Sequence, residues 1–313
     1  MELTTFIISG FKRAGTTLLN RLFDSEPGII DYNDEAYFWE HVYRYDEAGR
    51  IDLFVDLFRS FSADELIQGF IDRDILPWIE GRYVRQAVVN EYELDLGLDQ
   101  ERFRAGLAGL AGCETVQDIW TVLTRAYADA MDTDYSGCTR TMIKSADFGL
   151  GILSSRKYLD RVRHLFLVRN PFYTLDSLKK SRMRRQQKIL HPFNFAEAVR
   201  DLTFFWQNRE RILGPDTYCI QYERLVSKPR EVMEEVAAHL GIPFTENLLR
   251  PTMLGKDWEG YSSFSLASGI DASMLDRPLK MLEPHEVRFA ERHLAEMLEH
   301  YGYVSGQQRP AQG

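Results

Sequence analysis

The chain has 313 residues, of which 44% are hydrophobic, which is enough for one large α/β domain or two modest ones. Its net charge of −9 argues against general nucleic-acid binding, which usually needs a basic surface. No apolar stretch approaches the roughly 20 residues of a membrane span, and no secretory signal pattern precedes the first expected strand. The spacing of Cys113, Cys138 and Cys219 fits neither a disulfide framework nor a zinc site, so a reducing, cytoplasmic setting is expected.

Short apolar runs recur along the chain with helical patterns between them. The first, Phe6-Ile7-Ile8-Ser9, precedes a glycine turn and a helical pattern. Later runs at 141–144, 164–169 and 217–222 are also predicted to be strands. Strands separated by helices indicate a parallel sheet with crossover helices. The sequence therefore predicts an α/β fold with three layers, similar to the P-loop nucleotide triphosphatases.

The block from about residue 37 to 135 has a different character. It is rich in acidic and aromatic residues at helical spacing, as in Ile119-Trp120-x-x-Leu123. We interpret it as a helical insertion between the first and second core strands. Its tryptophans, Trp39, Trp78 and Trp120, are expected to pack in a core.

The C-terminal region predicts a helix that begins near Pro284 and buries Val287, Phe289, Leu294 and Met297 on one face. The polar tail, residues 305–313, is expected to be disordered. Because the sequence shows no internal repeat and no linker, we predict a single domain over residues 1–304.

The most informative segment is Gly10-Phe11-Lys12-Arg13-Ala14-Gly15-Thr16-Thr17. It departs from the phosphate-binding pattern G-x-x-x-x-G-K-[ST] at one position, because Thr16 stands where the lysine belongs. A strand, a glycine turn and the start of a helix still supply backbone N–H groups for an anion. The lysine that reaches the β- and γ-phosphates is absent.

The expected metal partner is missing too. Kinases and ATPases with this loop take a metal ion through an acidic residue that ends a nearby strand. Here the strand at 164–168 ends in Arg169-Asn170-Pro171. A phosphosulfate fits such a loop, because its sulfuryl group carries one negative charge fewer than a terminal phosphoryl group. Arg169 and Ser177, eight residues apart and two turns along the next helix, can converge on a second phosphate.

These motifs resemble those of the sulfotransferases that use 3′-phosphoadenosine 5′-phosphosulfate (PAPS). The segment 13–19 resembles the 5′-phosphosulfate loop of the branch that reads R-S-G-T-T-L-L, whereas the cytosolic branch has lysine at the position of Arg13. The segment 165–177 resembles the 3′-phosphate motif. Tyr222-Glu223-x-Leu225-Val226 with Leu240-Gly241-Ile242-Pro243 resembles a third landmark, whose tyrosine lies by the adenine, and Tyr301-Gly302-Tyr303 resembles the usual end of the domain.

The resemblance implies a set of residues that bind the donor. Arg277 resembles a basic residue that closes over the 3′-phosphate, with Lys280 as the fallback. The loop 262–265 is a weaker candidate. The donor-binding residues implied are Lys12, Arg13, Ala14, Gly15, Thr16, Thr17, Leu18, Arg169, Ser177, Tyr222 and Arg277.

The resemblance also suggests catalytic roles. Arg13 would stabilise the transferring group, and Lys144 would contact the sulfonate or the leaving oxygen, as in the tyrosylprotein branch. The cytosolic branch places its histidine base where this chain has Ala146. In other branches the base is a glutamate in the loop after the first helix, here residues 27–35. Glu35 is therefore the predicted base and Asp34 the alternate, with His41 weaker.

The basic run Lys179, Lys180, Arg182, Arg184, Arg185 and Lys188 is either a solvated helix face or a patch that attracts an anionic donor or acceptor. The expected activity is metal-independent transfer of a sulfuryl group from PAPS to the hydroxyl of a small molecule, lipid, sugar or peptide. A metal-dependent small-molecule kinase and an inactive nucleotide-binding protein are the alternatives. A homodimer is compatible with the sequence.

Overall fold

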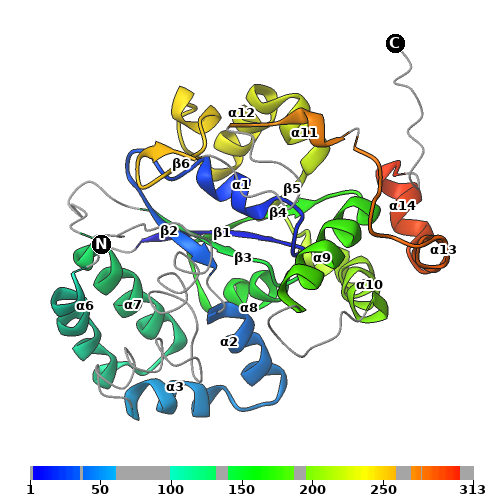
Figure 1. Cartoon of the computed structure of the whole chain (residues 1–313). Helices are drawn as coiled ribbons and strands as arrows, with labels where there is room; N and C mark the ends of the chain where they lie inside the picture. The colour runs from blue at the N-terminus through cyan, green and yellow to red at the C-terminus, as the bar shows by residue number, and fades with distance from the viewer. Residues whose placement is uncertain are drawn as a thin grey trace.

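The computed structural model describes residues 3–35, 38–60, 99–131, 140–186, 195–258, 269–275 and 277–303. Five parallel strands form its central sheet in the order β2-β3-β1-β4-β5 (Figure 1). The strands are β1 (Thr4–Gly10), β2 (Ile29–Glu35), β3 (Arg140–Ser145), β4 (Val162–Val168) and β5 (Thr217–Gln221). The four strand segments predicted from the sequence are confirmed.

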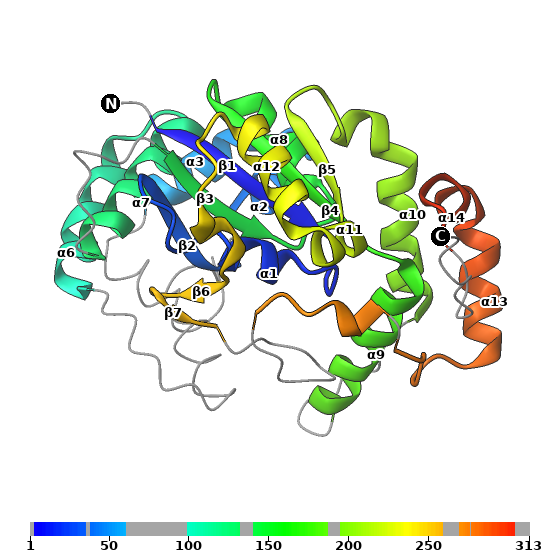
Figure 2. The ribbon, with the colours of Figure 1, turned by 90° about the horizontal axis from the view of Figure 1, so that it is seen from above.

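Helices cover both faces of the sheet and make three layers. One face packs against α1 (Thr16–Arg21), α11 (Tyr222–Ser227) and α12 (Pro229–Leu240). The other packs against α8 (Leu150–Tyr158), α9 (Pro171–Gln186) and α10 (Phe195–Ile212), together with the helices of the insertion (Figure 2). Alternation along β1 explains the two cores, because Phe6 and Ile8 join the first and Ile7 joins the second. The predicted α/β fold is thereby confirmed.

Strand β2 corrects one expectation. The resemblance placed the segment 27–35 in a loop after the first helix, yet Ile29–Glu35 is an edge strand of the sheet. Its register with β3 is irregular: Asp31 pairs with Met142 and Glu35 pairs with Lys144, so β2 carries two additional residues there. The helical insertion consequently lies between the second and third strands rather than between the first and second.

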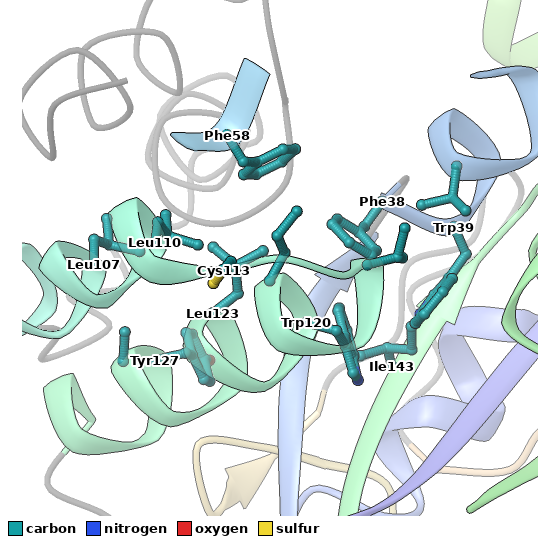
Figure 3. Close-up of a cluster of buried hydrophobic side chains, with 14 of the residues drawn as sticks. Phe38, Trp39, Phe58, Leu107, Leu110, Cys113, Trp120, Leu123, Tyr127 and Ile143 are labelled. Carbon is teal, nitrogen blue, oxygen red and sulfur yellow. The ribbon is translucent and has the colours of Figure 1, made fainter. Parts of the chain in front are cut away.

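The described part of the insertion is helical, as predicted. It contains α2 (Phe38–Glu47), α3 (Ile51–Ser60), α6 (Gln100–Leu107), the 3₁₀ segment η1 (Ala108–Gly112) and α7 (Val116–Ala130). Trp39 and Trp120 are buried side by side in its core, with Phe38 between them and α3 (Figure 3). The Trp120 indole N–H also donates to Thr5 Oγ1 at 3.0 Å, which fastens the insertion to β1. Trp78 lies outside the described residues.

The C-terminal region forms two helices, not the one expected. α13 (Pro284–His293) and α14 (Ala295–Tyr301) are separated by Leu294 alone. Leu294 and Met297 are buried as predicted, but Phe289 is 37% exposed. The remaining elements are η2 (Glu246–Leu249), the hairpin of β6 (Thr252–Met253) and β7 (Lys256–Asp257), and η3 (Ala272–Leu275). The tail 305–313 lies outside the described residues.

None of the helices in the described ranges is both long and apolar enough to cross a bilayer.

Candidate functional site

The loop between β1 and α1 lies at the carboxyl end of the sheet and turns within a few residues. Its tightest turn is closed by the Ala14 N–H, which donates to the Phe11 carbonyl at 3.0 Å. Arg13 and Gly15 both have positive φ, 74° and 108°, so the loop winds back on itself around Ala14. A Cβ atom at Gly10 would lie 2.7 Å from the Leu167 carbonyl oxygen, so glycine lets the loop start close against β4.

Two segments far apart in the sequence meet at Arg13. Its Nε donates to Ser177 Oγ on α9 at 3.1 Å. The Arg169 side chain at the end of β4 donates from Nη1 to the Arg13 carbonyl at 3.0 Å. Two hydrogen bonds therefore join the predicted 5′-phosphosulfate loop directly to the predicted 3′-phosphate motif.

Arg169 is a buried cation, 8% exposed. Its guanidinium lies over the Tyr222 ring, 4.3 Å from the ring centre, and burial lowers the pKa of Arg169, with the nearby positive charge of Arg277 acting in the same direction. Among the residues that the structure describes, its Nε has no hydrogen-bond partner. Desolvated arginines close to each other are costly, and a bound anion would offset that cost.

Tyr222 forms the floor beneath this arginine and packs against the loop. A Cβ atom at Gly15 would lie 2.7 Å from Tyr222 Cε2, so the absence of a side chain at Gly15 makes room for the ring. Arg169 and Gly15 thus hold Tyr222 between them. The arrangement leaves a cation, a flat aromatic ring and a glycine turn together at one end of the sheet.

Lys144 lies on the other side of the loop, at the end of β3. It is 4% exposed, and its Nζ donates to Thr17 Oγ1 in the first turn of α1 at 3.3 Å. Its backbone pairs in register with Glu35, the last residue of β2. The side chains of Asp34 and Glu35 lie outside the described part of the chain. The structure therefore places the backbone of the predicted base beside Lys144, and the choice between Asp34 and Glu35 stays a prediction.

The other predicted residues of the loop differ in burial. Ala14, Thr16 and Leu18 are buried, whereas Lys12 is half-buried and its charge interacts with Asp201 on α10. His41, the weaker base candidate, lies on α2, where burial lowers the pKa of its imidazole.

Two acidic residues without a predicted role hold the site together. Asp176, one residue before Ser177, pairs with Arg277 at 2.6 Å. Glu223 accepts the Asn170 N–H at 2.9 Å and the Tyr303 hydroxyl at 3.0 Å. In the sequence, Asp176 and Glu223 stand next to Ser177 and Tyr222, which belong to the predicted donor-binding motifs. The sequence did not show which groups the two carboxylates contact.

The basic run on α9 contributes a structural contact at its start. Lys179 Nζ bonds both carboxylate oxygens of Glu286 on α13, at 2.9 and 2.7 Å. This ion pair accounts for Lys179 as a link between α9 and α13. The side chains of Arg182, Arg184 and Arg185, as well as Lys188 and the loop 262–265, lie outside the described residues.

An acidic residue does follow a strand next to the loop, which bears on the kinase alternative. Asp147, two residues beyond β3, is buried and accepts the Ser9 hydroxyl at 2.6 Å and the Gly151 N–H at 2.8 Å. The Gly149 N–H also donates to it at 3.1 Å. Its carboxylate thus serves the start of α8, and burial raises the pKa of Asp147 to about 6.

The comparisons with known proteins agree with this geometry. A sulfotransferase family model matches residues 73–246, more than half of the chain. The chain belongs to the sulfotransferase family. The matched region of this sulfotransferase includes Lys144, Arg169, Ser177 and Tyr222, while the loop at 10–17 precedes it.

Two solved structures share the fold along the whole length. The sulfotransferase domain from the Synechococcus PCC 7002 olefin synthase matches with a TM-score of 0.57 and 19% identity, over 97% of this chain and 96% of that one. The sulfotransferase domain from the curacin biosynthetic pathway matches with the same TM-score and identity, over 97% and 99%. A search of curated proteins found no match.

Proposed function

We propose that this sulfotransferase takes its sulfuryl group from PAPS and transfers it to an acceptor hydroxyl. The observation that carries the proposal is the buried Arg169, which lies over Tyr222, reaches the Arg13 carbonyl, and has Arg277 nearby. Cations gathered around an aromatic ring suit a ligand that carries both phosphate groups and a flat base. PAPS is such a ligand, and when bound it supplies the sulfuryl group.

Each cluster of residues would bind a different part of the donor. The loop from Lys12 to Thr17, with Leu18, would hold the 5′-phosphosulfate through its backbone N–H groups. Arg169, Ser177 and Arg277 would hold the 3′-phosphate, and Tyr222 would lie beside the adenine. The loop lacks the P-loop lysine, which agrees with a terminal group that needs less charge neutralisation than a γ-phosphate.

The catalytic roles follow from charge and position. Arg13, which contacts Ser177, and Lys144, which contacts Thr17, would stabilise negative charge on the transferring group and the leaving oxygen. Glu35, whose backbone pairs with that of Lys144, would accept the proton of the acceptor hydroxyl, with Asp34 as the alternate. The acceptor is a hydroxyl on a small molecule, lipid, sugar or peptide.

Calorimetric titration with 3′-phosphoadenosine 5′-phosphate (PAP), the product nucleotide, tests the donor. We expect tight binding that is unchanged by EDTA, because arginine and lysine side chains would supply the positive charge and backbone N–H groups the hydrogen bonds. ATP with Mg²⁺ is the comparison ligand. Binding of ATP–Mg²⁺ without binding of PAP would favour the kinase alternative and contradict the proposal.

Replacing the base provides the second test. We expect Glu35→Gln to lower the turnover of labelled PAPS with a panel of hydroxyl acceptors by about a hundredfold or more, because general base catalysis contributes about that much. PAP affinity should be unchanged. Asp34→Asn is the matched control, and a loss of turnover in that variant alone would assign the base to Asp34.

A further inference from the structure

The segment that carries Arg277 is attached to α9 by a single buried carboxylate. Asp176 is fully buried, and its Oδ2 receives Arg277 Nη1 at 2.6 Å. Its Oδ1 accepts the backbone N–H groups of Lys280 at 2.9 Å and Met281 at 2.7 Å. One side chain therefore fixes both the charged end and the backbone of a segment about a hundred residues further along the chain.

Because Asp176 is buried, losing any of these partners would be energetically costly. A carboxylate without solvent is costly unless a cation and hydrogen-bond donors compensate it, and here all three named partners come from the segment 277–281. Arg277 also donates from Nη2 to the Tyr173 carbonyl, one helical turn before Asp176, at 3.3 Å. Figure 2 shows this segment, in orange, passing α9 on its way to α13.

The attachment point is next to the predicted phosphate site. Asp176 immediately precedes Ser177, whose hydroxyl accepts from Arg13. Arg277 contacts Asp176 and the Tyr173 carbonyl, one and four residues before Ser177, so its guanidinium lies on the part of α9 that carries Ser177. Its charge also acts on Arg169 and Tyr222. A change at Asp176 would therefore move a cation at the edge of the site while leaving the loop 10–17 in place.

We infer that Asp176 is a positioning residue that sets the preference of this sulfotransferase for nucleotides with a 3′-phosphate. It does so by holding Arg277 against α9 beside Ser177, where the guanidinium meets that phosphate. This inference rests on the proposed function, in which PAPS is the donor. Through Asp176, binding of the 3′-phosphate depends on the segment 277–281, whereas binding of the adenine and of the 5′ end does not.

The test compares two nucleotides that differ only in the 3′-phosphate, PAP and adenosine 5′-phosphate (AMP), by calorimetry on the full chain. We expect Asp176→Asn to lower the preference for PAP over AMP by about tenfold or more, since hydrogen bonds to charged groups are worth about that much. AMP affinity should stay within about twofold. A general loss of structure would instead weaken both nucleotides together.

Glu286→Gln is the matched control, because Glu286 also ties α9 to the C-terminal region but contacts Lys179. It should lower the melting temperature and leave the preference unchanged. If Asp176→Asn does not fold, Arg277→Gln tests the cation that Asp176 holds. The preference should be lost, and a retained preference would contradict the inference.

Three outcomes would overturn the inference. The first is a folded Asp176→Asn or Arg277→Gln protein that keeps the preference of the unmodified chain. The second is an equal loss of preference in Glu286→Gln. The third is an unmodified chain that binds PAP and AMP equally well. Binding of neither nucleotide by the unmodified chain would instead reject the proposed function itself.

Discussion

Gly15 determines both the backbone conformation of the loop and its packing against Tyr222, the residue predicted to lie by the adenine. Its φ of 108° is unfavourable for residues with a side chain, and the Tyr222 ring occupies the place where a Cβ would be. Arg13 adopts a positive φ as well, but its side chain is directed to Ser177. Glycine at position 15 therefore permits both the backbone conformation of the loop and the close approach of Tyr222.

We predict that Gly15→Ala lowers PAP affinity by about tenfold or more, because the methyl group displaces Tyr222 and the Arg169 side chain over it. The free energy of unfolding should fall by about 1–3 kcal/mol from backbone strain and the clash. Calorimetry and urea unfolding measure the two effects. Gly49→Ala is the control: Gly49 has a φ of 65° with no atom within 4 Å of an added Cβ, so it should lose some stability without losing affinity.

The contact between β2 and α1 was not predicted from the sequence. Asp31 on β2 is buried and accepts a hydrogen bond from Asn20 on α1 at 2.5 Å. Burial raises the pKa of Asp31 to about 8, although the positive charge of Arg21 and the bond from Asn20 act against the rise. Thr17, one turn before Asn20 and Arg21, meets Lys144, so one side of α1 carries a polar contact zone against the edge of the sheet.

This zone predicts a pH dependence. The folded chain binds the Asp31 proton more tightly than the unfolded chain does, so stability falls as the pH rises from about 4 to about 8. Asp31→Asn removes that loss and keeps an oxygen for Asn20. We expect the variant to be more stable than the unmodified chain by about 5 kcal/mol at pH 8, with little difference near pH 4.

Urea unfolding at several pH values measures this effect. Asp257→Asn, at an exposed carboxylate paired with Arg250, is the control and should leave the pH profile nearly unchanged. Parallel stability profiles for the Asp31→Asn variant and the unmodified chain would show that Asp31 is ionised in the folded state.

Across the whole molecule, the C-terminal region closes on the carboxyl end of the sheet. Tyr303 donates to Glu223, whose other oxygen holds the Asn170 N–H directly after Arg169. Arg277 and Glu286 attach to α9 in the same region. The end of the described chain therefore supports the predicted nucleotide site, although it is distant from the loop in sequence.

We expect Tyr303→Phe to lower the free energy of unfolding by about 1–2 kcal/mol, because the half-buried carboxylate of Glu223 loses a hydrogen bond. PAP affinity should fall severalfold, since Glu223 then holds Asn170 less firmly. Thermal unfolding and calorimetry measure both. Tyr301→Phe, whose hydroxyl contacts Cys219 at 3.8 Å, is the control, and an equal loss of affinity in that variant would mean that the effect is not transmitted through Glu223.

The sequence by itself determined the features that depend on neighbouring residues. The short apolar runs predicted four of the five central strands, and the glycines around Arg13 predicted a loop for an anion, because apolar runs and glycine turns are visible in neighbouring residues. The spacing of Arg169 and Ser177 predicted a second anion site. β2 was not predicted, because its residues 31–35 lack the apolar run that identified the other strands. An edge strand pairs with a neighbour on one side only, so it tolerates these polar residues.

Only the tertiary structure decided which distant residues meet. The contacts of Arg13 with Ser177, of Arg169 with Tyr222, and of Asp176 with the segment 277–281 join residues that lie about 50 to 160 positions apart. No local pattern encodes such contacts, because they follow from the order of the strands and from the helices that close over their carboxyl ends. The sequence predicted the loop, whereas the residues that contact it were identified only by the tertiary structure.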